Sequence, residues 1–314
     1  MRQFVTVIAL LATAAARLAA QTPELKEGEG YVSVPGGRLW YRVVGKGPRT
    51  PLLVVHGCCG VGSYYLAPLA ALSDERPVIF FDQIDNGRSD RTNDTTYWRM
   101  PRLVEEIRRV REALGLREIH LYAHSFGAAI ATEYMLTKPR GVRSLVLAGA
   151  QLDMSRSADD FRPLLAALPD SMQRAIADHE RDGTTSAPAY QRAMLHFMRQ
   201  YHARHLPWSA ELDSSLAHSN APMASFIYGA GPTQITGWMR TYKHGPELGA
   251  IEVPTLLMVG KYDYTSTASA RYYQTLIPGS RMAVFEESGH LAMQDEPEKY
   301  VSLLRAFLRS TERR

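Results

Sequence analysis

Ser125 stands where a nucleophilic hydroxyl could carry out acyl transfer. It is the centre of the pentapeptide AHSFG, directly after an apolar run and directly before a helix-like run. A serine on such a strand-to-helix turn is forced outward, and small residues two before and two after it, here Ala123 and Gly127, let the backbone close the turn. Because short patterns of this kind also arise by chance, the position between the two runs carries the prediction.

Asp263 and His290 follow the serine in the order that a hydrolase of this design requires. Asp263 ends the sequence GKYD after the apolar run 255–259, and His290 ends ESGH after the run 282–285. Loops at the carboxyl ends of strands converge in open α/β sheets, so we expect His290 to act as general base and Asp263 to orient it. The alternative, a capping aspartate and a surface histidine, does not explain this joint placement.

The sequence HGCCG, residues 56–60, follows the run 52–55 and is the predicted oxyanion loop. In such an arrangement this loop donates one backbone N–H and the residue after the nucleophile donates another, which gives Cys58 and Phe126. The glycines could instead mark a simple turn, or a thiol of Cys58 or Cys59 could be the nucleophile. The thiol is disfavoured because no base is evidently paired with it.

No metal or organic cofactor is required for this chemistry. The two cysteines are adjacent, a placement that rarely reaches disulfide geometry, and no Cys/His spacing indicates a metal site. We therefore predict that the protein uses no cofactor.

Alternating strand-like and helix-like segments must position these residues. A hairpin is predicted over 31–34 and 38–44 around a Pro-Gly-Gly turn. Runs without polar alternation indicate strands buried on both faces, and helical periodicity separates them. The predicted buried strands are 52–55, 78–81, 119–122, 145–147, 255–259 and 282–285, and the predicted helices include 103–114, 126–136 and 297–308.

The alternation of strand-like and helix-like segments stops between residues 151 and 250. This stretch has helical periodicity and no clear strand. The predicted fold is α/β: a mostly parallel, doubly wound sheet of the α/β-hydrolase type with an inserted helical cap. The predicted parts are a signal peptide 1–20, a first core segment 21–150, a cap 151–250 and a second core segment 251–314. Trp208, Phe226, Tyr228 and Trp238 are candidates for an apolar substrate pocket, or alternatively for the packing of the cap itself.

The charge distribution and the first residues of the chain indicate which classes of partner to expect. The net charge of +4 is spread along the chain, and the arginines of 102–117 alternate with glutamates as on a solvated helix face, so nucleic-acid binding is not expected. The first 20 residues have a cationic start, an apolar run and a small-residue exit, which predicts a secretory signal and a periplasmic or secreted protein. An uncleaved membrane tether and a wrongly assigned start of the chain are the alternatives. No stable membrane insertion is expected after signal removal, and the oligomeric state stays open.

The chain resembles the prolyl aminopeptidase (proline iminopeptidase) branch of the α/β hydrolases over most of its length. The segment FDQ through GRSD, residues 81–90, is similar to that branch's D-Q-x-G-x-G-x-S motif, and residues 231–237 resemble its cap motif G-P-N-E-F-x-x-T-G. The sequence RHLPW at 204–208 and the histidine loop GHL at 289–291 also match. The resemblance implies release of N-terminal residues, proline preferentially, from short peptides.

Several positions depart from that pattern. H-G-G-P-G is present as HGCCG, the glycine expected after Ile84 is Asp85, and the cap glutamate expected to pair with a substrate's amino group is Gln234. An amide can hydrogen-bond an ammonium group but adds no opposing charge. Glu211 or Asp213 could supply a replacement charge.

The predicted function is therefore a serine hydrolase that works through an acyl-enzyme on a small-molecule or short-peptide substrate. An aminopeptidase follows from the resemblance, and Gln234 favours the alternative, a carboxylesterase or amidase acting on small apolar acyl groups. The remaining hypothesis is a small-molecule binding protein that keeps the pocket but has lost turnover.

Overall fold

One mostly parallel sheet forms the centre of the protein, as the apolar runs predict. The computed structural model describes residues 25–57, 60–231 and 235–312. The strands are β1 Gly28–Val34, β2 Gly37–Val44, β3 Leu52–Val55, β4 Val78–Phe81, β5 Ile119–His124, β6 Val142–Ala148, β7 Thr255–Gly260 and β8 Arg281–Phe285. Their order across the sheet is β1-β2-β4-β3-β5-β6-β7-β8, with β1 and β2 antiparallel to their neighbours and the others parallel.

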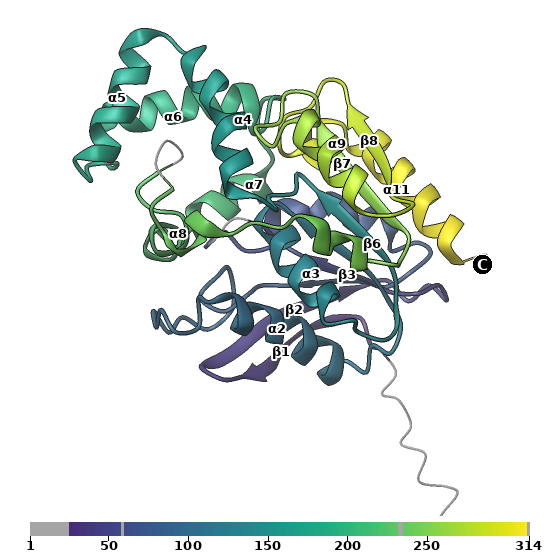
Figure 1. The fold of residues 1–314 in the computed structure, drawn as a ribbon. Helices are drawn as coiled ribbons and strands as arrows, with labels where there is room; N and C mark the ends of the chain where they lie inside the picture. Colours follow the sequence, from purple (N-terminus) through teal and green to yellow (C-terminus); the bar gives the residue numbers. More distant parts are fainter. Residues whose placement is uncertain (1–24, 58–59, 232–234, 313–314) are drawn as a thin grey trace, which may run out of the picture.

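Helices cover both faces of this sheet (Figure 1). The core helices are η1 Tyr64–Leu72, α2 Met100–Ala113, α3 Phe126–Leu136, η3 Pro246–Ala250, α9 Thr267–Leu276, α10 Ala292–Asp295 and α11 Pro297–Glu312. Alternate residues of β3 belong to opposite cores: Leu53 and Val55 pack with α2 and α3, whereas Leu52 and Val54 pack with η1 and α11. This two-sided burial explains why the central strands are apolar throughout.

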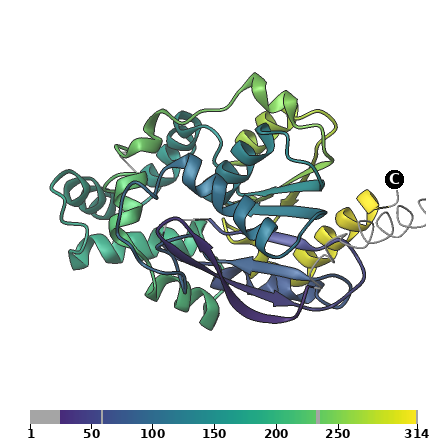
Figure 2. The same ribbon diagram turned by 90° about the horizontal axis from the view of Figure 1, so that it is seen from below.

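The cap lies between β6 and β7 in the chain. Its helices are α4 Met154–Ala166, α5 Asp170–Arg181, α6 Pro188–Tyr201, α7 Ala210–Ala217, α8 Ala221–Ile227 and η2 Trp238–Thr241. They gather at one end of the sheet, on the left in both views (Figures 1 and 2). The cap has a small core of its own around Phe197, Tyr190 and Ile176. Within the described residues, none of the helices is both long and apolar enough to cross a membrane.

The topology creates a switch point at β3. The chain leaves β3 through η1 on one face of the sheet and leaves β5 through α3 on the other face. Ligands of open α/β sheets bind at the carboxyl ends of strands where connections diverge in this way. The predicted oxyanion loop and Ser125 follow the two strands that flank this point.

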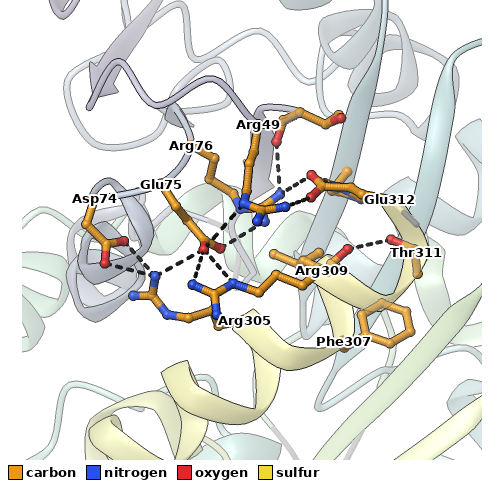
Figure 3. Close-up of polar contacts among 12 residues, drawn as sticks. Arg49, Asp74, Glu75, Arg76, Arg305, Phe307, Arg309, Thr311 and Glu312 are labelled. Atoms are coloured by element: carbon orange, nitrogen blue, oxygen red, sulfur yellow. Dashed lines mark hydrogen bonds and ion pairs between the residues drawn. The ribbon is translucent and has the colours of Figure 1, made fainter.

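An ionic network ties the C-terminal helix to the core on the side of η1 (Figure 3). The Arg76 side chain is fully buried and lies 2.9 Å from Glu75 and 2.9 Å from Glu312. Further arginines, Arg49 and Arg309, bind the same two carboxylates at 2.7 Å and 2.6 Å. Burial alone would raise the pKa of Glu75, but hydrogen bonds from Arg76 and Arg309 outweigh it and lower the pKa.

Removing the central cation should destabilise the fold. An Arg76→Met variant is expected to lose about 3 kcal/mol of unfolding free energy, because it removes the fully buried cation that Glu75 and Glu312 share and leaves these carboxylates with only the more exposed arginines. The exposed pair Arg143–Glu118 is the matched control, and Arg143→Met should cost less than about 1 kcal/mol. Urea denaturation at neutral pH measures both. Since the folded-state pKa of Glu75 is lowered, the contribution of this carboxylate is present at neutral pH and is lost as the pH falls through that value. Equal losses in both variants would contradict the role given to Arg76.

Candidate active site

Ser125 occupies a strained turn between β5 and α3. Its backbone has φ 55° and ψ −123°, a positive φ that is uncommon for a residue other than glycine. Its N–H donates to the carbonyl of Ala148, 2.8 Å away at the end of β6. A Cβ at Gly127 would lie 2.4 Å from the carbonyl oxygen of His56, so only glycine lets α3 start this close to the loop after β3. The turn therefore has the local structure predicted for a nucleophile.

His290 and Asp263 form a buried pair. His290 Nδ1 lies 2.8 Å from Asp263 Oδ1, and both residues are less than 5% exposed. The carboxylate also accepts the N–H of Thr265 at 2.7 Å, which holds it in place. Because a carboxylate only accepts, Nδ1 carries the proton and the lone pair of the neutral ring is on Nε2. Within the described part of the chain, Nε2 has no hydrogen-bond partner, so it is available to accept a proton.

The end of β6 brings the serine and the pair together. Ala148 holds the Ser125 backbone, and the next residue, Gly149, lies against both members of the pair. A Cβ at Gly149 would be 2.8 Å from His290 Cε1 and 3.2 Å from Asp263 Oδ2. The end of β6 thus places the Ser125 turn next to the His290–Asp263 pair. The bond from serine to histidine is not formed here, as is common in substrate-free enzymes, where it tightens when substrate binds.

The cap holds the histidine loop directly. The N–H groups of His290 and Leu291 donate to the carbonyls of Tyr201 and His202 at the end of α6, at 2.9 Å and 2.7 Å. The Tyr264 ring stacks on the imidazole of His290 at a centroid distance of 4.1 Å. The cap and the His290 loop are therefore one connected unit.

Asp295 explains part of the sequence RHLPW in the cap. Its carboxylate is buried and accepts the N–H groups of Arg204 and His205 at 2.8 Å and 2.9 Å. Its other oxygen accepts the N–H of Gly289, 2.9 Å away. One carboxylate thus joins the segment after α6 to the histidine loop.

Only part of the predicted oxyanion hole lies within the described residues. His56 Nε2 accepts the N–H of Gln83 at 3.0 Å, and the Gln83 side chain returns a bond to the carbonyl of His56 at 2.9 Å. This exchange fixes the start of the loop after β3 to the loop after β4. Phe126 opens α3, where the first N–H groups have no partner within the helix. Cys58, the other predicted donor, lies outside the described residues.

The predicted pocket residues fall into two groups. Tyr228 and Trp238 each pack edge-to-face with Phe126, at centroid distances of 5.9 Å and 6.5 Å. The indole N–H of Trp238 is buried and has no hydrogen-bond partner among the described residues. Trp208 instead donates to the carbonyl of Ala203 at 3.0 Å and packs against the core on the η1 side. Gln234 lies outside the described residues.

Comparison with known proteins agrees with this geometry. Residues 50–297 match the family described as the alpha/beta hydrolase fold. The chain is 34% identical over 286 residues to a proline iminopeptidase of Heyndrickxia coagulans, covering 90% of this chain and 99% of that one. It is 31% identical to a proline iminopeptidase of Saccharolobus solfataricus, covering 89% and 92%. The chain belongs to the proline iminopeptidase branch of the α/β-hydrolase family.

Solved structures support the assignment. The proline iminopeptidase of Mycobacterium smegmatis superimposes with a TM-score of 0.83 at 26% identity, covering 90% of this chain and 98% of that one. VinJ superimposes with a TM-score of 0.87 at 26% identity, covering 90% and 99%. An esterase of Exiguobacterium antarcticum, at 22% identity and a TM-score of 0.68 with 90% and 100% covered, shares the fold.

One departure from the proline iminopeptidase pattern is compensated locally. Asp85 stands where the pattern has glycine and adopts φ 63°, a conformation that aspartate tolerates better than most residues. Its carboxylate accepts the indole N–H of Trp98 at 2.7 Å and the N–H of Asn93 at 2.8 Å. The substituted side chain therefore holds the loop that leads into α2.

Two residues that the sequence interpretation overlooked lie against the site. His124 directly precedes the nucleophile, and its ring packs on His290 at a centroid distance of 4.6 Å. Tyr65, on η1, bonds to His124 with its hydroxyl at 2.8 Å. The available signal for His124 was a polar ring in a fully buried strand, directly before the predicted nucleophile. Nothing in the sequence indicated Tyr65.

The pH dependence of activity should reflect the burial of His290. Burial lowers the pKa of His290 below its ordinary value and raises the pKa of its partner Asp263. The two groups titrate as one pair, and the reaction needs a neutral imidazole beside an ionised carboxylate, so activity is lost as the pH falls and the pair takes up one further proton. We therefore expect kcat/KM to fall along one acid limb that belongs to the pair. Rates measured from about pH 4 to about pH 9 test this, and a rate that stays constant down to about pH 4 would contradict it.

Proposed function

We propose that the protein is a serine aminopeptidase that releases N-terminal proline or other residues from short peptides. The carrying observation is the buried His290–Asp263 pair beside a strained Ser125 turn, in a chain that is 34% identical to a proline iminopeptidase over 90% of its length. The candidate residues have the order, the tautomer and the burial that acyl transfer requires.

The reaction has two half-reactions. Ser125 Oγ attacks the substrate carbonyl while His290 Nε2 takes the hydroxyl proton, and Asp263 stabilises the imidazolium that forms. The tetrahedral intermediate collapses as His290 gives this proton to the leaving amine, leaving an ester on Ser125. Water then attacks this ester and gives a proton to His290 Nε2. The second tetrahedral intermediate collapses as the Oγ–carbon bond breaks, and His290 returns the proton to Ser125 Oγ while the acid is released.

The oxyanion of each tetrahedral intermediate needs preorganised donors. The N–H of Phe126 is one proposed donor because it directly follows Ser125 and opens α3. The N–H of Cys58 is the other proposed donor, from its place in the sequence after Gly57. Losing one such donor typically costs about 10²- to 10³-fold in kcat.

An esterase or amidase is the second candidate function. It is favoured by Gln234, an uncharged side chain at the position where the resembling branch has an amine-binding glutamate. Glu211 and Asp213, the proposed replacements, lie in the first turn of α7 and are both exposed. Recognition of a neutral apolar acyl group would need no acidic side chain. A binding protein without turnover leaves the intact Ser125, Asp263 and His290 unexplained.

Two chromogenic substrate sets separate these functions. The first holds prolyl and other aminoacyl anilides with free amino groups, together with the same compounds acylated on nitrogen. The second holds short-chain acyl esters. Cleavage of free but not blocked anilides establishes the aminopeptidase, whereas cleavage of esters alone establishes the esterase.

We propose export as the route of this protein. Residues 1–20, which lie outside the described residues, have the composition of a secretory signal. Cell fractionation followed by N-terminal sequencing tests this proposal. A mature chain that begins at Gln21 in the periplasm or medium supports it, and an uncleaved chain in the cytoplasm contradicts it.

A further inference from the structure

We propose that His124 is a positioning residue for this reaction, which joins the oxyanion loop, the nucleophile turn and the histidine loop through one chain of hydrogen bonds. The inference rests on the proposed acyl-enzyme function. It concerns a residue that touches neither the substrate carbonyl nor the transferred proton.

The chain runs from Gly57 to His290. The N–H of Gly57 donates to the Tyr65 hydroxyl at 2.7 Å, and this hydroxyl lies 2.8 Å from His124 Nδ1. On the other side of the ring, His124 Nε2 lies 3.1 Å from the carbonyl oxygen of His290. The three loops that must be in register for catalysis are thereby connected through a single imidazole.

The direction of each bond follows from the carbonyl at its end. A carbonyl only accepts, so Nε2 of His124 carries a proton. Burial lowers the pKa of His124 well below the ordinary histidine value, and the nearby His290 lowers it further, so the ring is neutral. Nδ1 is therefore an acceptor, and the Tyr65 hydroxyl donates to it. Each member of the chain has one defined role.

Packing leaves little freedom at this point. His124 is 1% exposed, and its ring lies between Tyr65, at a centroid distance of 5.3 Å, and His290, at 4.6 Å. A Cβ at Gly57 would lie 2.6 Å from the His124 carbonyl and 2.6 Å from Ser125 Cβ. Gly57 directly precedes the proposed donor Cys58 in the sequence. A shift of the His124 ring would therefore move the oxyanion loop and His290 relative to Ser125.

The neutral state of the His124 imidazole also favours the reaction. His290 becomes positively charged in the transition state, and a charged neighbour at this distance would oppose that change. A buried, neutral imidazole supplies two directional hydrogen bonds without that penalty. A phenylalanine would keep the shape but lose both bonds.

β5 supplies a matched control. His120 lies four residues before His124 on the same strand face and is also fully buried. It bonds to Ser144 at 2.7 Å and to Glu312 at 3.2 Å, near the ionic network of Figure 3 and away from Ser125. Replacing either histidine with phenylalanine removes two side-chain hydrogen bonds, but only His124 bonds to the proposed active-site loops.

The test compares His124→Phe, Tyr65→Phe, their double variant and His120→Phe. The first readout is the rate at which a fluorophosphonate inactivates each variant. This rate needs Ser125, its base and the oxyanion donors but no amine recognition, so it stays informative if prolyl anilides are not substrates. The second readout is kcat and KM on whichever substrate the native protein cleaves, with the melting temperature measured for every variant.

We expect His124→Phe to lower the inactivation rate and kcat by about 10- to 100-fold with KM little changed, as for a small misplacement of reacting groups. Tyr65→Phe, which removes one hydroxyl and preserves packing, should lower both by a smaller factor, and the double variant should be no worse than His124→Phe. His120→Phe should lower the melting temperature and leave both rates within about twofold. Native rates in His124→Phe, multiplicative losses in the double variant, or equal losses in His120→Phe would overturn the proposal.

Discussion

A Ser125→Ala variant is expected to lose about 10⁶-fold in kcat on any substrate that the native protein cleaves. Without Oγ there is no acyl-enzyme, and His290 and Asp263 alone cannot provide an equivalent path. Purified native and variant proteins should be compared on the anilide and ester sets. The variant's melting temperature should stay close to native, because alanine keeps the side-chain volume at a position that is only 4% exposed.

The same variant distinguishes the proposed nucleophile from the alternative thiol. Loss of turnover in Ser125→Ala together with retained turnover in a Cys58→Ser, Cys59→Ser variant assigns the reaction to Ser125. Activity in Ser125→Ala within about tenfold of native would contradict the assignment, since a triad nucleophile contributes far more than that.

The second large effect is expected at Asp263. An Asp263→Asn variant should lose up to about 10⁴-fold in kcat with KM little changed, because a neutral amide no longer stabilises the imidazolium that forms on His290. Asp263 Oδ1 lies 2.8 Å from Nδ1 and also accepts the N–H of Thr265 at 2.7 Å. The amide oxygen would therefore take this place, and the loss of activity would come from the missing negative charge.

Asp160 provides the control for Asp263. Its carboxylate binds the N–H and hydroxyl of Ser266, at 3.1 Å and 2.6 Å, in the same loop but without contact to His290. Asp160→Asn makes the same chemical change nearby and should keep kcat within about threefold. If both variants lose activity equally, Asp263 acts by holding the loop rather than by stabilising the imidazolium.

The central strands could be predicted because burial on both faces leaves a plain sequence signature. The runs 52–55 and 78–81 coincide with β3 and β4, and the helix at 126–136 coincides with α3. The connection η1 was not anticipated. It is a 3₁₀ segment with Pro68 inside, and it lacks the amphipathic periodicity by which a surface helix is recognised.

The candidate site was predictable where function depends on position along the chain. Ser125, Asp263 and His290 each follow a strand's carboxyl end, and parallel strands bring those ends together. The support around them was not predictable, because it depends on which side chains meet in space. Tyr65 reaches His124 from η1, a segment 59 residues earlier, and no local pattern records that contact.

Labelling with a fluorophosphonate, followed by peptide mass spectrometry, tests the central claim most directly. The native protein is expected to carry a single adduct on Ser125, and the Ser125→Ala variant none. An adduct at Cys58 or Cys59, or no adduct on the folded native protein, would contradict the account of this chain as a serine hydrolase.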